Sequence, residues 1–182
     1  MTSSAVFLLL LFHGALASYT PQWKQPRLFV SFWYDPVVPQ SNFPAAYAQI
    51  ALANFTAVLG GFGAKTADAI EAQLSAADAL DLGVVAATNY GGGDALPISD
   101  YGGNHPSLWG YQIKDEPAAS EFADLAAYSD QVAAQVPGKL RFSNLLPHCP
   151  PKQLNATDYD DYVTRYARVI RARPTLQAHD HL

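Results

Sequence analysis

The chain has 182 residues, of which 49% are hydrophobic and only 15% charged, and its net charge is −5. This composition supplies enough apolar material for a buried core and excludes a disordered tail. The acidic balance and the absence of any run of Lys or Arg argue against nucleic acid and anionic membrane surfaces as partners.

The N-terminus has the pattern of a secretory signal peptide. Residues 5–17 form an apolar run that ends in Ala15-Leu16-Ala17, a small-x-small cleavage site before Ser18. The run is shorter than the ~20 residues that a bilayer-spanning helix needs. We expect residues 1–17 to be removed and the protein to be secreted with no membrane span; a retained signal anchor or a buried first helix are the alternatives.

In a secreted protein, cysteines can form disulfides and Asn-x-Ser/Thr sequons can be glycosylated, so Cys149 and two sequons need to be considered. Cys149 is the single cysteine and is either buried as a small hydrophobe or lacks a former partner. The sequons begin at Asn54 and Asn155. Asn155 lies in a predicted polar loop, which suits a glycan, whereas the sequon at Asn54 runs into a predicted strand, where a glycan would disturb packing.

After a leader at 18–27, short apolar runs alternate with amphipathic stretches, which is typical of βα units and a parallel sheet. The runs that predict strands are 28–34, 56–59, 84–87, 109–114 and 140–143, with a possible sixth in 175–182. The stretches that predict helices are 42–53, one capped by Thr66 and ended by Gly83, 120–136, and one from Thr157, with Asp160 as its capping-box acid, to Arg173.

These elements predict an α/β fold, an incomplete TIM-type (β/α)8 barrel with five to six βα units in one domain, 28–182. A closed barrel of eight such units takes roughly 250 residues. On this interpretation the chain lacks about two units.

The active site of a parallel barrel gathers where its strands end. Polar residues follow nearly every predicted strand of this chain. The candidates are Asp35, Asn89, Tyr90, Asp115, Glu116, Asn144 and, after the possible sixth strand, Asp180.

The densest group is the segment 109–117, Trp-Gly-Tyr-Gln-Ile-Lys-Asp-Glu-Pro. A carboxylic acid at a barrel mouth, partly shielded from water by Trp and Tyr, can donate a proton to a leaving group. Pro117 cannot continue the ladder and turns the chain outward at the two acids. A polar strand-to-helix turn with no chemistry is the alternative for the same residues.

This segment also carries a resemblance. Gly110-Tyr111, followed by Asp115-Glu116-Pro117, an Ala-rich helix and a strand that ends in Asn144-Leu145-Leu146-Pro147, resembles secreted glycoside-hydrolase-type (β/α)8 barrels with a fourth-strand Asp-Glu-Pro motif. The terminal segment 174–181 adds to the likeness, because such chains carry an Asp-His-Tyr-like turn near the sixth strand. The resemblance covers roughly 28–181.

The resemblance implies that Glu116 is the general acid/base. Asp115 stands where many members have the Asn that binds the sugar 2-hydroxyl, so it is either the acid itself or an acceptor for a sugar hydroxyl. The nucleophile would follow a seventh strand, beyond this chain. Retaining hydrolysis needs two carboxyl groups ~5–5.5 Å apart, and neighbours on a strand point to opposite faces, so Asp115 and Glu116 do not readily supply both.

The expected partner is a carbohydrate, bound by Asp35, Asn89, Tyr90, Tyr111, Asn144 and Asp180, although aromatic side chains near strands more often belong to the core. We expect no cofactor and no metal, because the glycine runs at 60–63 and 91–93 match no nucleotide-binding fingerprint and the pair His179 and His181 is an isolated one. The alternatives are an inactive secreted carbohydrate-binding or interaction protein, or an open sheet too incomplete to fold stably.

Overall fold

The computed structural model describes residues 23–33, 35–60, 64, 66–87, 105–148 and 151–171. Several predictions fall outside these ranges. They are the signal peptide at 1–17, the first half of the leader at 18–22, the fate of Cys149 and the possible sixth strand.

The described residues form one parallel sheet of four strands in chain order, β1-β2-β3-β4. The strands are β1 (Ala57–Leu59), β2 (Gly83–Ala87), β3 (Leu108–Asp115) and β4 (Leu140–Asn144). The predicted α/β class with a parallel sheet is therefore confirmed.

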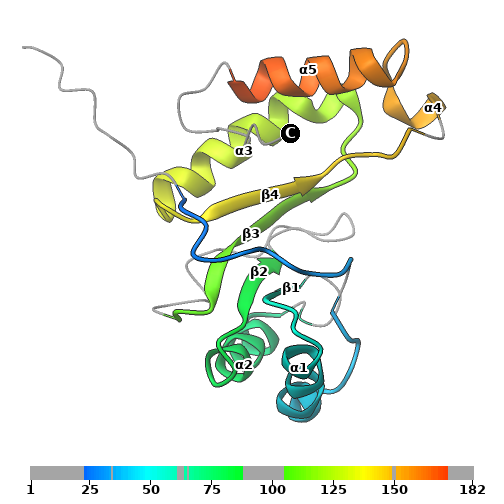
Figure 1. Cartoon of the computed structure of the whole chain (residues 1–182). Helices are drawn as coiled ribbons and strands as arrows, with labels where there is room; N and C mark the ends of the chain where they lie inside the picture. Colours follow the sequence, from blue (N-terminus) through cyan, green and yellow to red (C-terminus); the bar gives the residue numbers. More distant parts are fainter. Residues whose placement is uncertain are drawn as a thin grey trace, which may run out of the picture.

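Helices connect and flank these strands (Figure 1). They are α1 (Phe43–Leu52), preceded by the 3-10 turn η1 (Gln40–Asn42), α2 (Ala67–Asp78), α3 (Phe122–Gln135), preceded by η3 (Ala119–Glu121), α4 (Pro151–Leu154) and α5 (Tyr159–Arg171). Figure 1 shows α1 and α2 side by side near β1 and β2, and α3 beside α5 near β4. Right-handed connections between consecutive parallel strands place their helices on one face of the sheet.

The main core lies between the sheet and α1, α2 and α3. Its buried side chains include Tyr47, Ile70, Leu74 and Tyr111. A second, smaller cluster sits beyond β4, where α3, α4 and α5 meet. Its buried members are Phe122, Leu146, Leu154 and Tyr162.

Over its described residues, 28–33, the first predicted strand (28–34) is an extended segment beside β1. Its hydrogen-bond ladder with β1 is incomplete because the Thr56 side chain bonds two of its backbone groups. The Thr56 hydroxyl accepts from the Val30 amide at 2.8 Å and donates to the Leu28 carbonyl at 2.6 Å. Backbone bonds to β1 remain at Val30 and Asp35. A side chain that competes for backbone groups thus limits strand formation here.

Two predicted helix boundaries were wrong. Helix α2 is capped by Thr66 as expected, but it ends at Asp78, and Gly83 is the first residue of β2. At the start of α5 the cap is Asp158, whose carboxylate accepts from the Asp161 amide at 2.8 Å. The Asp161 side chain reaches back to the Thr157 amide at 3.0 Å, so the capping arrangement lies one residue later than the predicted pair.

None of the helices within the described ranges combines the length and apolar character that crossing a bilayer requires.

Candidate functional site

A β-bulge near the end of β3 determines where its acidic side chains point. Along β4, Phe142 and Asn144 are two residues apart and therefore share a face of the sheet. Their partners on β3 are Gln112 and Asp115, which are three residues apart, with the register shift falling between Gln112 and Lys114. The extra residue turns Asp115 onto the face that Gln112, Phe142 and Asn144 share.

Asp115 and Asn144 are direct partners across the parallel ladder, at the carboxyl ends of adjacent strands. The Oδ1 atoms of both side chains are buried, and neither accepts a hydrogen bond from any residue that the structure describes. A buried acceptor without a donor costs about 1–3 kcal/mol. Two such oxygens on residues that pair across the ladder are suited to a ligand that brings its own hydrogen-bond donors.

Glu116 follows directly and is exposed, with its backbone in the left-handed region at φ 44°. This conformation costs a side-chain-bearing residue roughly 1–2 kcal/mol. Its amide donates to the Asn144 carbonyl at 3.1 Å, which extends the contact between β3 and β4 by one residue beyond the strands. Strain of this kind is often found at functional sites.

The turn after Glu116 is fixed by charge and by hydrogen bonds. The Lys114 ammonium lies 3.0 Å from the Glu121 carboxylate, and the other oxygen of that carboxylate accepts from the Ala118 amide at 2.8 Å. The bond from Ala118, together with Lys114, holds the pKa of Glu121 below its ordinary value despite partial burial. On the β4 side, the Ser143 hydroxyl donates to the Lys114 carbonyl at 2.8 Å.

Tyr162 of α5 ties this turn to the end of β4. Its hydroxyl donates to the Pro117 carbonyl at 2.6 Å and accepts from the Leu146 amide at 3.1 Å, and its side chain is completely buried. Sequence reasoning missed Tyr162, whose only signal in the sequence is its place in the apolar periodicity of α5. It also missed Gln112, a 2% exposed polar residue on the face of Asp115, whose signal was a lone amide in an apolar strand.

Asp35 was predicted to contact substrate, but the structure buries it completely. Its carboxylate accepts from Tyr47 of α1 at 3.2 Å and from the Gln73 amide of α2 at 2.7 Å. Burial, followed by the Asp35 charge, raises the pKa of the Tyr47 phenol. Asp35 therefore joins the segment before β1 to α1 and α2.

Tyr111 was likewise predicted to bind sugar, yet only 1% of it is exposed and it packs in the main core. Burial raises the pKa of Tyr111 to about 12. A side chain enclosed to this extent offers no face for stacking. Its alternation with Gln112 places it on the opposite side of the sheet from Asp115.

The remaining predicted positions divide by whether the structure describes them. The substrate-binding candidates Asn89, Tyr90 and Asp180 lie outside the described residues. Both sequon asparagines, Asn54 and Asn155, are exposed, with φ of 61° and 50°. Asn54 occupies the turn after α1 and not the strand, so the packing objection to a glycan there does not hold.

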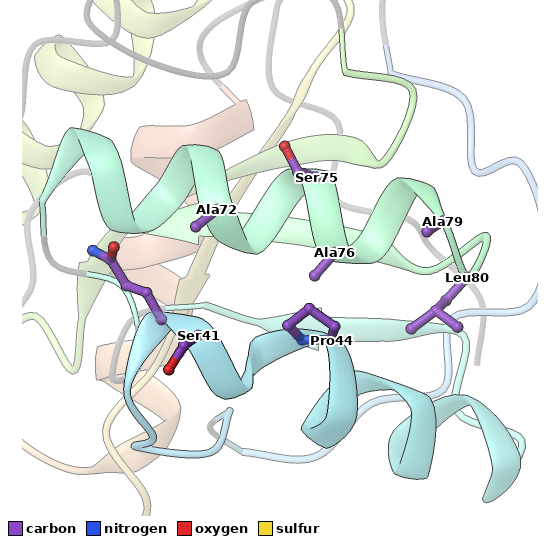
Figure 2. Close-up of a pocket in the computed structure, with 8 residues that line it drawn as sticks. Ser41, Pro44, Ala72, Ser75, Ala76, Ala79 and Leu80 are labelled. Carbon is purple, nitrogen blue, oxygen red and sulfur yellow. The ribbon is translucent and has the colours of Figure 1, made fainter.

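A groove of about 430 Å³ lies elsewhere, between α2 and the start of α1 (Figure 2). In Figure 2, Pro44 faces Ala76 across the groove, and the wall formed by α2 carries small side chains. The groove is lined by residues of η1, α1, α2 and the turn after α2. None of the polar residues at the carboxyl ends of β3 and β4 lines it. Within the described ranges, no three His, Cys, Asp or Glu side chains are grouped so as to hold a metal ion.

Comparisons with known proteins add no relative to this picture. No protein-family model matches the sequence, and no curated protein and no solved structure matches it.

Proposed function

We propose that this protein acts on or binds carbohydrate at the carboxyl ends of β3 and β4, with Glu116 as general acid/base and Asp115 and Asn144 as acceptors for sugar hydroxyls. The observation that carries the proposal is the pair of buried Oδ1 atoms, which have no donor among the described residues, next to an exposed, strained glutamate. Sugar hydroxyls are donors as well as acceptors, so a saccharide supplies what these two oxygens lack.

The arrangement of the sheet supports a barrel as the scaffold. Four parallel strands in consecutive order, with α2 between β1 and β2 and α3 between β3 and β4, are the arrangement expected of part of a (β/α)8 wall. In such a wall the carboxyl ends of the strands form the mouth, and Asp115, Glu116 and Asn144 are at those ends. The glycoside-hydrolase-type barrel that the Asp-Glu-Pro motif suggests belongs to this proposal, as does export through the signal sequence.

In the proposed reaction the Glu116 carboxylic acid donates its proton to the glycosidic oxygen as the bond to the anomeric carbon breaks. The side chain of Asp115 lies on the same face of the sheet as that of Asn144, whereas Glu116 lies in the turn beyond the strand. The two acids therefore have different surroundings and different roles. The attacking group, a second carboxylate or an activated water, comes from outside this motif.

A second candidate, carbohydrate binding without hydrolysis, is favoured by one feature of the same site. The buried oxygens of Asp115 and Asn144 can accept hydrogen bonds from a sugar hydroxyl by themselves. Binding does not need the second carboxylate that hydrolysis needs. Binding and turnover are thus separable properties here.

The test compares the wild type with Glu116→Gln on a glycan array and on aryl glycosides and polysaccharides. Hydrolysis predicts glycan binding by both proteins and turnover that Glu116→Gln lowers by about 10²–10⁴-fold, the range for loss of a general acid. Asp124→Asn, which neutralises an exposed acid on α3, is the control and should leave turnover unchanged. Binding with no turnover in either protein supports the second candidate; unchanged turnover in Glu116→Gln contradicts the first.

A further inference from the structure

The backbone around Glu116 is held from both sides, and one of these contacts comes from a distant helix. Before Glu116, the ladder ends with its amide on the Asn144 carbonyl at 3.1 Å. After it, the Pro117 carbonyl accepts from the hydroxyl of Tyr162, 45 residues later in the chain, at 2.6 Å. A left-handed residue persists only where its surroundings overdetermine it, and these two bonds do so.

Burial, ring packing and two hydrogen bonds hold the Tyr162 side chain in one orientation. It is completely buried, and its ring lies against Phe122, with ring centres 5.1 Å apart, and against Tyr159 at 5.9 Å. Its hydroxyl donates once and accepts once, which joins the turn after β3 to the Leu146 amide after β4. Burial, and among smaller effects the Glu116 charge, raise the pKa of this phenol, so the hydroxyl keeps its proton and remains a donor.

We infer that Tyr162 is a positioning residue for Glu116, fixing the turn that aims the proposed acid relative to Asp115 and Asn144. The inference rests on the proposed function in assigning Glu116 a role, but the positioning itself concerns backbone geometry and is measurable without a substrate.

The first readout is amide hydrogen exchange in Tyr162→Phe, which removes the hydroxyl and keeps the ring. The Leu146 amide loses its acceptor directly, and the Glu116 amide, which does not touch Tyr162, should also exchange faster, on the order of tenfold. The Gly60 amide, bonded to Val85 far from this turn, should be unchanged. Tyr159→Phe is the matched control, because it removes a hydroxyl from the same aromatic cluster and should leave Glu116 exchange as in the wild type.

The second readout is turnover of aryl glycosides, where Tyr162→Phe should lower kcat about tenfold and leave KM within about twofold, because the binding oxygens are untouched. An unchanged exchange rate at Glu116 in Tyr162→Phe overturns the inference, and so does equal acceleration at Gly60, which indicates general destabilisation. If the wild type neither binds nor cleaves glycans, the proposed function fails, while the exchange pattern still decides the positioning role.

Discussion

Asp115 faces Asn144 across the ladder between β3 and β4, with an acceptor oxygen of each side chain buried and without a donor among the described residues. This arrangement is unfavourable for the isolated fold. It follows from a bulge that moves Asp115 onto the face of Asn144, and the stability of variants should reveal its cost.

Asp115→Asn should make the protein more stable. The new amide can donate to the Asn144 Oδ1, which converts two unpaired acceptors into a hydrogen-bonded pair, and the free energy of unfolding should rise by about 1 kcal/mol. Urea denaturation measures the change. A loss of stability on this substitution would show that the carboxylate already has favourable contacts.

Glu116→Gly should also stabilise, for a different reason. Glycine adopts φ 44° without the steric penalty of roughly 1–2 kcal/mol, and its greater freedom in the unfolded chain offsets part of that gain. The free energy of unfolding should therefore rise by about 0.5–1 kcal/mol. Glu116→Gln keeps the strained backbone and should leave stability within experimental error. If both variants unfold like the wild type, the left-handed conformation is not strained.

His105 should make stability depend on pH. Its Nδ1 lies 2.5 Å from Asp78 and its Nε2 lies 2.9 Å from Glu71, and only an imidazolium can donate to both carboxylates. Burial opposes this charge, but the bonds to Asp78 and Glu71 outweigh it and raise the pKa of His105. The pKa of Asp78 is lowered: burial opposes the shift, and bonds from Ser107 and His105 outweigh it.

The directions of the two pKa shifts define the pH range in which this cluster stabilises the fold. A raised histidine pKa contributes stability that is complete below the unfolded value of about 6.5 and is lost as pH rises through the folded value. A lowered Asp78 pKa contributes stability above about 3.8 that is lost as pH falls through the folded value. Stability from this cluster should therefore peak between about pH 4 and 6.5 in a series of urea titrations. His105→Gln should remove the decline above pH 6.5, and His148→Gln, at an exposed histidine, should retain it.

Gly60→Ala should be destabilising, because an added Cβ would approach the Gln73 amide to 2.7 Å at Nε2, the atom that bonds Asp35. We expect a loss of about 1–3 kcal/mol by thermal or urea unfolding. In a Gln73→Ala background the same substitution should cost much less, because the obstructing side chain is gone. Equal costs in both backgrounds would place the strain in the Gly60 backbone.

The sequence predicted the sheet well because apolar runs and caps act locally. Four of its five main strands are strands in the structure, and Thr66 caps α2 as its spacing to the Ala69 amide requires. The first predicted strand was lost to a contact that local pattern does not contain, the reach of the Thr56 hydroxyl across 26 residues to the Val30 amide.

The sequence indicated which residues lie at the strand ends, but not which face of the sheet each side chain occupies. Strand ends indicated Asp115, Glu116 and Asn144, and the structure brings these three together. Strict alternation, however, assigns Asp115 to the face of Tyr111, and the bulge that reverses this appears only once β3 is paired with β4. Asp35 also fits a strand-end pattern, and only packing shows that α1 and α2 enclose it.

The most direct test of the central claim is glycan binding by Asp115→Asn, measured on an array and by titration with the best wild-type ligand. If sugar hydroxyls fill the acceptor pair, the amide of the variant competes with them, and affinity should fall at least about tenfold, equivalent to about 1.4 kcal/mol, in a protein that is more stable than the wild type. Wild-type affinity in this variant would contradict the claim that carbohydrate binds between Asp115 and Asn144.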